Sequence, residues 1–185
     1  MNQILIKTTV SKLAIIALIV LQGMNGPSAL GQDGRLGIEP MKKLSHWVGE
    51  WEGNGWQMQP SGERIEFSVR ESVQSKLNGL VLMMEGKGMS DGSDELGHDA
   101  VGMIYHNLDN KRYEFHSTTI QGTTILAEAK FDEDGNFIWG FDIPQGKVQF
   151  TITLTEDTWV EKGAFSPDGG GTWYPTMEMN LKKIR

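Results

Sequence analysis

From residue 47 onward, apolar and polar side chains alternate with a period of two, the spacing of half-buried β-strands. Residues that favour turns, such as Asn78-Gly79 and Gln145-Gly146, separate the runs. The runs cover residues 51–59, 64–75, 80–88, 98–106, 112–119, 123–131, 136–143, 147–154, 158–165 and 172–182. No long helical pattern lies between them, so we expect antiparallel neighbours joined by tight turns.

Such a meander leaves two exposed edges unless its first and last strands pair. Closure removes both edges at once. We therefore predict an all-β fold, a single antiparallel up-and-down β-barrel of about ten strands, over residues 40–185. Pro40 suits the first turn of a helix, and a short helix is expected over Met41–His46, before the first strand.

The stretch Trp47–Trp56, WVGEWEGNGW, holds three of the six tryptophans, interleaved with glycines. Glycine weakens a strand unless the chain bends sharply or another group approaches closely. A barrel corner requires both, so this stretch is predicted to open the barrel.

The N-terminal segment has the layout of a secretory signal. Lys7 and Lys12 precede the apolar run Leu13–Leu21, and small residues follow as far as Gly31. The apolar run is too short to span a bilayer. We predict a signal peptide over residues 1–31, a linker over 32–39 and a periplasmic or secreted protein; an uncleaved membrane anchor is the alternative.

Composition narrows the choice of partners. The chain has no cysteine, so an exported protein must be stabilised by its core alone. Removing Lys7 and Lys12 changes the net charge from 17 − 24 = −7 to 15 − 24 = −9. This acidity, without any basic run, argues against nucleic acid and, after signal cleavage, against membrane surfaces. The expected partner is a small hydrophobic ligand; the oligomeric state is left open.

Glutamates recur in the middle of the strand-like runs: Glu71, Glu85, Glu114, Glu128, Glu161 and Glu178. Those on the inward face of a barrel would line a ligand cavity, but the sequence leaves open which face points inward. The candidate ligand-binding residues are Trp51, Trp56, Arg70, His106, His116, Trp139 and Glu178.

Two residue types among these candidates have an alternative role. Arg70 could clamp a ligand carboxylate through its planar guanidinium, or pair with a neighbouring glutamate. His98, His106 and His116 could ligate haem iron or exchange protons, whereas a hydrogen-bonded or exposed histidine is the commoner case.

Two loop motifs are predicted to be structural. The acidic loop from Asp91 to Asp99 matches no spacing of a metal-binding loop, so neither a metal site nor a cofactor is predicted. Ser166–Trp173 (SPDGGGTW) fits the Asp-box pattern S-x-D-x-G-x-T-W, similar to the repeated hairpins of sialidases. A single copy indicates a stable turn in which Asp168 accepts hydrogen bonds from backbone N–H groups.

Four segments carry a family resemblance: WVGEWEGNGW, SGERIEFSVRESVQSKLNGLVLMMEGKG, HDAVGMIYHN and SPDGGGTWYPTMEMNLKKI. Together they resemble a bacterial lipocalin-like (calycin) domain family of unknown function (DUF1579-like) over Met41–Ile184. The opening G-x-W of calycins, here Gly49-Glu50-Trp51, implies that Trp51 packs across the closed end of the barrel beside a basic residue of the last strand. Lys182, Lys183 and Arg185 are the candidates.

A more distant resemblance joins GEWEGNG to the nitrobindins, ten-stranded barrels that bind haem through a histidine in their C-terminal part, and to the fatty-acid-binding proteins. This chain has no histidine after His116, so that ligand has no match.

Three functions follow as hypotheses. The favoured one is an exported protein that binds a small hydrophobic ligand in its barrel. The alternatives are a haem- or metal-binding protein, and an enzyme that acts on a small hydrophobic substrate through a histidine paired with Glu114 or Glu178.

Overall fold

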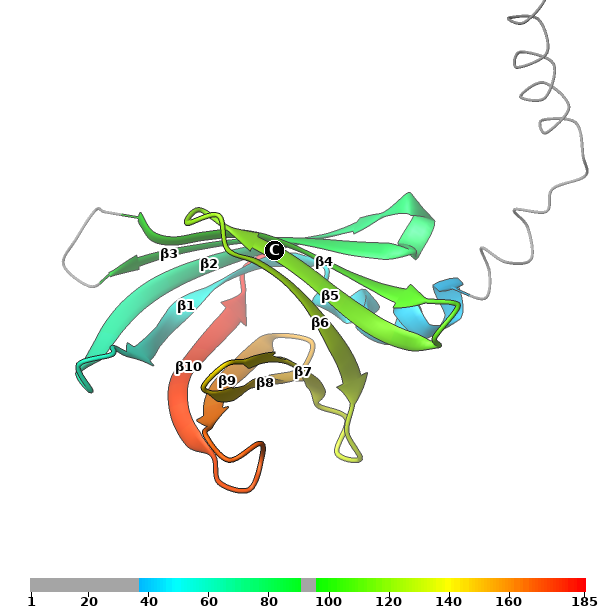
Figure 1. Cartoon of the computed structure of the whole chain (residues 1–185). Helices are drawn as coiled ribbons and strands as arrows, with labels where there is room; N and C mark the ends of the chain where they lie inside the picture. The colour runs from blue at the N-terminus through cyan, green and yellow to red at the C-terminus, as the bar shows by residue number, and fades with distance from the viewer. Residues whose placement is uncertain (1–36, 91–95) are drawn as a thin grey trace, which may run out of the picture. The chain divides into compact units, whose positions relative to one another are not determined.

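In the computed structural model, which describes residues 37–90 and 96–185, ten strands form a closed antiparallel barrel (Figure 1). The predicted signal peptide, most of the predicted linker and part of the acidic loop lie outside the described residues. The strands are β1 (Gly49–Met58), β2 (Arg64–Lys76), β3 (Val81–Ser90), β4 (Leu96–Asn107), β5 (Arg112–Thr119), β6 (Thr124–Phe131), β7 (Phe137–Ile143), β8 (Gly146–Leu154), β9 (Thr158–Ser166) and β10 (Tyr174–Lys183).

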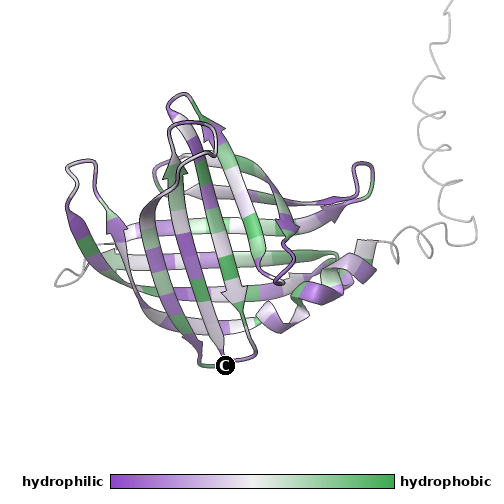
Figure 2. Ribbon diagram, turned by 90° about the horizontal axis from the view of Figure 1, so that it is seen from below, coloured by the Kyte–Doolittle hydropathy of each residue, from purple (hydrophilic) through white to green (hydrophobic). Residues whose placement is uncertain are grey.

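Every strand pairs with its neighbours in the sequence, and the first strand pairs with the last. The closing β1–β10 ladder runs from Trp51 opposite Lys183 to Gln57 opposite Met177. The predicted fold class is confirmed, and the strand bounds differ from the predicted ones by only a few residues. Hydropathy alternates along the strands, as Figure 2 shows, because successive side chains point to opposite faces of the sheet.

A short helical segment precedes β1. Residues 37–41 are helical and lead into the 3-10 helix η1 (Lys42–Trp47), so the helical segment begins before Pro40. Its buried side chains are Met41, Leu44 and Trp47. Within the described part of the chain, no helix is long and apolar enough to cross a membrane.

Trp51 closes one end of the barrel. Its indole Nε1–H donates to the backbone oxygen of Trp47 at 2.9 Å, and its ring lies edge-on to Trp159 at 5.8 Å between centroids. Lys183 Nζ lies 5.0 Å from the centroid of the Trp51 ring and donates to the backbone oxygen of His46 at 3.0 Å. The expected contact between the opening tryptophan and a basic residue of the last strand is confirmed, and Lys183 is that residue.

The Asp-box segment forms the predicted turn between β9 and β10. Asp168 Oδ1 accepts the backbone N–H groups of Thr172 at 2.8 Å and Gly171 at 2.9 Å, and the Ser166 hydroxyl at 2.7 Å. These bonds, that of Thr172 first, hold the pKa of Asp168 well below its ordinary value. The indole N–H of Trp173 donates to the Gly170 oxygen at 3.1 Å and completes the turn.

Candidate ligand-binding cavity

The barrel encloses a cavity of about 430 Å³, lined by residues of all ten strands. This volume falls within the range of roughly 300–1,000 Å³ in which small-molecule sites are found. Most of the lining is apolar, and aromatic side chains form much of the wall: Phe67, Phe115, Trp139, Phe141, Phe150 and Trp159.

Strand parity decides which glutamates enter this cavity. Glu71 on β2 and Glu161 on β9 line it, and both side chains are buried. Glu85, Glu128 and Glu178 lie on the opposite face of their strands. Glu114 is also buried, but its carboxylate accepts hydrogen bonds from Asn107 and Asn110 away from the cavity lining.

Glycines make room for large side chains on the β3–β4 wall. Gly86 and Gly102 both line the cavity. A Cβ built at Gly86 would lie 2.8 Å from Glu71 Oε2, and one built at Gly102 would lie 3.1 Å from Phe115 Cζ. The absence of side chains at these two positions therefore leaves the space that Glu71 and Phe115 occupy.

Glu161 accepts a hydrogen bond from one tryptophan side chain. Trp139 Nε1–H donates to Glu161 Oε1 at 3.3 Å. The indole nitrogen of Trp159 is also buried, and it has no hydrogen-bond partner among the described residues. Burial raises the pKa of Glu161 to about 7, and the hydrogen bond from Trp139 opposes the shift.

Glu71 has no such donor. Its side chain is 9% exposed, and none of the hydrogen bonds or ion pairs within residues 37–90 and 96–185 involves it. Burial raises the pKa of Glu71 to about 8, and the nearby charge of Glu161 contributes in the same direction. The two carboxyl groups therefore act on each other inside one cavity.

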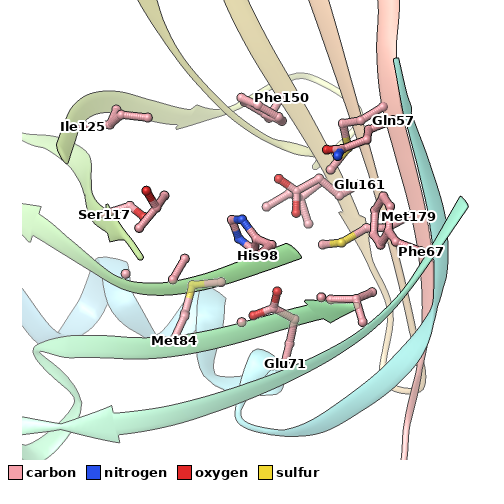
Figure 3. Close-up of a pocket in the computed structure, with 18 of the residues that line it drawn as sticks. Gln57, Phe67, Glu71, Met84, His98, Ser117, Ile125, Phe150, Glu161 and Met179 are labelled. Atoms are coloured by element: carbon pink, nitrogen blue, oxygen red, sulfur yellow. The ribbon is translucent and has the colours of Figure 1, made fainter. Parts of the chain in front are cut away.

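His98 on β4 is the third titratable group of the lining. Its side chain is exposed to solvent, and partial desolvation lowers its pKa, with Asp99 acting in the opposite direction. Figure 3 shows His98, Glu71 and Glu161 directed toward the same space.

Two of the candidate residues from the sequence lie at or near the cavity. Trp139 lines it and donates to Glu161. Trp51 lies outside the lining and packs against Trp159, which belongs to it. His106 packs edge-on against Tyr113 at 5.2 Å between ring centroids and does not line the cavity.

The structure places the other four candidates on the outer face of the barrel. The Arg64 guanidinium lies 3.7 Å from the centroid of the Trp56 ring, and Trp56 faces Glu178 across the β1–β10 ladder. Arg70 pairs with Glu52 at 2.9 Å on the exposed surface, so its role is structural and it does not clamp a ligand in the cavity. His116 on β5 lies opposite Met103 of β4 on one side and opposite Leu126 of β6 on the other.

A sequence signal marks Glu71 as inward, but it does not separate all of the glutamates. Glu71 has valines two residues away on both sides, and Glu161 has Trp159. Glu178 has the polar residues Thr176 and Asn180 at those positions. Residues two apart share a face of a strand, but the outward Glu85 and Glu128 also have one apolar neighbour at that spacing, Met83 and Leu126. Only the apolar neighbours on both sides of Glu71 therefore indicate an inward glutamate.

Comparison with solved structures supports the same fold. Rv2717c from M. tuberculosis matches with a TM-score of 0.63 at 12% identity, over 78% of this chain and 97% of the other. The S-type phycobiliprotein lyase CPES from Guillardia theta matches with a TM-score of 0.56 at 14% identity, over 85% and 97% of the two chains. No family model matches the sequence, and no curated protein matches it. The membership in the domain family of unknown function therefore stays a prediction, and the chain is similar to these proteins as a lipocalin-like β-barrel.

Proposed function

We propose that this protein is an exported lipocalin-like binding protein that holds a small apolar ligand inside the barrel. The observation that carries the proposal is the cavity of about 430 Å³, whose wall is largely aromatic and aliphatic. Concave apolar sites with a few polar groups are typical of small-molecule binding. The lipocalin-like folds of the two similar structures are compatible with it.

Binding can be tested with Nile red, a neutral lipophilic dye. Ser117→Phe would place a ring in the cavity, whereas Thr118→Phe adds the same ring to the exposed face of the same strand. We expect dye fluorescence with the wild-type protein and Thr118→Phe, and its loss with Ser117→Phe. Equal dye binding by both variants would contradict a site inside the barrel. Native mass spectra of the purified protein would show a retained ligand.

The same preparation tests the haem alternative. His98 is the histidine of the described cavity lining, so a Soret band after haem addition should disappear in His98→Ala if haem binds there. A Soret band that persists in this variant would remove His98 as the ligand.

Export is a separate part of the proposal and rests on the sequence of residues 1–31. Expression of the full chain in a bacterial host should yield a periplasmic or secreted product whose N-terminus is Gln32. A product that keeps residues 1–31 would contradict cleavage of the signal peptide.

An enzyme is the second candidate, favoured by the two cavity carboxyl groups. Groups with pKa values near neutrality suit proton transfer, and Glu71 and Glu161 have this property inside a site that can hold an apolar substrate. They replace the Glu114 or Glu178 of the sequence-based hypothesis, neither of which lines the cavity. A panel of apolar esters, epoxides and ketones would test turnover, with Glu71→Gln and Glu161→Gln expected to abolish it.

A further inference from the structure

The described lining of the cavity has acidic side chains but no lysine or arginine to balance them. Its titratable lining residues within the described chain are Glu71, Glu161 and His98, and the lining contains neither lysine nor arginine. The His98 side chain is exposed and its pKa is lowered, so any positive charge on the imidazole is rare near neutral pH and is screened by solvent. No basic side chain of the described lining therefore compensates Glu71 or Glu161 if they ionise.

The hydrogen bonding of the carboxyl groups is incomplete as well. Glu71, more than nine-tenths buried, points into the cavity without a partner among the described residues, while Glu161 receives one long bond from Trp139. Buried polar groups in native proteins nearly always have partners. An uncompensated buried carboxylate is costly, so a ligand that brings a donor or a positive charge would be stabilised here.

Resting on the proposed function, we infer that the ligand is a hydrophobic amine, whose ammonium group lies beside Glu71 and Glu161 and whose apolar body lies along Phe67, Phe115 and Phe150. An ammonium group has three N–H donors and no acceptor, which suits a site that holds two carboxyl groups. The cavity is large enough for an apolar body next to that head group.

Competing ligand classes fit less well. A carboxylic acid would bring a third acidic group beside Glu71 and Glu161, and like charges repel strongly in a buried site. A neutral alcohol could donate one hydrogen bond but would leave the carboxyl groups largely protonated, so it would gain no charge attraction. An ammonium group also gains from the faces of the aromatic rings in the wall and from the net negative charge of the chain.

The proposal predicts that a proton is released when the amine binds. With their pKa values raised to about 8 and about 7, Glu71 and Glu161 are largely protonated in the empty cavity at mildly acidic pH. An amine enters as its ammonium form, and its charge favours ionisation of one carboxyl group. The O–H bond of that carboxyl breaks and the proton passes to the buffer, so binding of the amine releases a proton and tightens as the pH rises toward 8.

The experiment compares three probes that share a phenylbutyl body: phenylbutylamine, phenylbutanol and phenylbutyrate. Calorimetric titration of the purified protein, repeated in buffers of different ionisation enthalpy, measures both affinity and proton release. We expect the amine to bind about tenfold or more tightly than the alcohol near neutral pH. At about pH 6 the amine should release up to one proton, and the alcohol none.

Variants then locate the head group. Glu71→Gln and Glu161→Gln keep the shape of the side chain, remove its charge, and should weaken amine binding about tenfold while leaving alcohol binding nearly unchanged. Glu85→Gln is the matched control, because Glu85 lies one residue from Gly86 on the outer face of β3 and is exposed. It should leave all three affinities unchanged. Proton release by the wild-type protein tests the inference independently of whether the variants fold.

The outcomes distinguish the inference from the proposed function. Equal affinity for amine and alcohol, tighter binding of the acid, or amine binding without proton release would overturn the inference and leave a binding barrel for neutral or anionic ligands. No binding of any phenylbutyl probe, together with no binding of Nile red, would overturn both.

Discussion

Gly86 lies directly opposite Glu71 in the β2–β3 ladder, and the Glu71 carboxyl group occupies the space that a side chain at Gly86 would fill. Gly86→Ala should move this carboxyl aside and lower the free energy of unfolding by no more than about 1 kcal/mol, because the contacted atoms are the end of a flexible side chain that faces the cavity. Urea denaturation measures the loss.

A double-mutant cycle isolates the cause of this loss. In a Glu71→Ala background, Gly86→Ala should cost much less, because the added methyl group then has room. Gly97→Ala is the control, since a Cβ there meets no atom closer than 3.4 Å, an ordinary van der Waals contact. Equal losses for Gly86→Ala in both backgrounds would contradict the proposed contact.

The stability of the empty protein should fall as the pH rises from about 5 to about 9. The pKa values of Glu71 and Glu161 are raised to about 8 and about 7 in the folded protein, against 4.5 for the ordinary group. Between these values the folded state binds more protons than the unfolded state, so the contribution of the two groups is complete at low pH and is lost through their folded pKa values.

Glu71→Gln and Glu161→Gln should each remove a few kcal/mol of this pH dependence. The comparison with the wild-type protein is needed because His46 and His98, whose pKa values are lowered by burial, act in the opposite direction. Unfolding curves across this pH range, with Glu85→Gln as the control, provide the measurement. A variant curve parallel to that of the wild type would show that the carboxyl group is not protonated on folding.

Lys183→Met should destabilise the closed end of the barrel by about 1–2 kcal/mol. The substitution removes the charge that lies over the Trp51 ring and the hydrogen bond to the His46 oxygen, while it keeps much of the aliphatic stem. Lys182 is the adjacent residue along β10, and its side chain is exposed on the outer face of the barrel. Lys182→Met should therefore have little effect on stability. Thermal unfolding followed by tryptophan fluorescence would compare the two, and equal midpoints would refute a stabilising role for Lys183.

Asp168→Ala should loosen the β9–β10 turn without changing the cavity. It removes the oxygen that accepts the N–H groups of Gly171 and Thr172. Amide hydrogen exchange at these two residues should become faster, whereas Nile red binding should persist. Because the pKa of Asp168 is depressed, the wild-type turn should stay protected until the solution is strongly acidic. Unchanged exchange in Asp168→Ala would show that other bonds hold the turn.

Most of the fold was predictable because its determinants are local. Period-two alternation and turn residues defined the ten strands, the Gly49-Glu50-Trp51 opening identified the first strand, and the spacing of Ser166–Trp173 predicted its turn. The need to pair the outer strands of a meander then led to closure, which the β1–β10 ladder confirms.

The residues that line the cavity were harder to predict from the sequence than the fold. Of the seven candidate residues, Trp139 lines the cavity, whereas Trp56, Arg70, His116 and Glu178 lie on the outer face. Which face a residue joins depends on the parity of its strand relative to the interior, and a one-residue change of register reverses it. The valines two residues to either side of Glu71 indicated its inward face, but the neighbours of Glu161 did not, and nothing in the sequence showed that the two glutamates meet.

The sequence by itself determined the strand count, the order of the strands and the glycines and tryptophans of the barrel corner, because each depends on residues close together in the chain. Only the tertiary structure decided that Glu71 and Glu161, on strands separated by almost half of the sequence, share one buried cavity without a basic side chain in its described lining. The physical reason is that curvature and closure bring β2 and β9 around a common interior, where burial changes the protonation of both carboxyl groups.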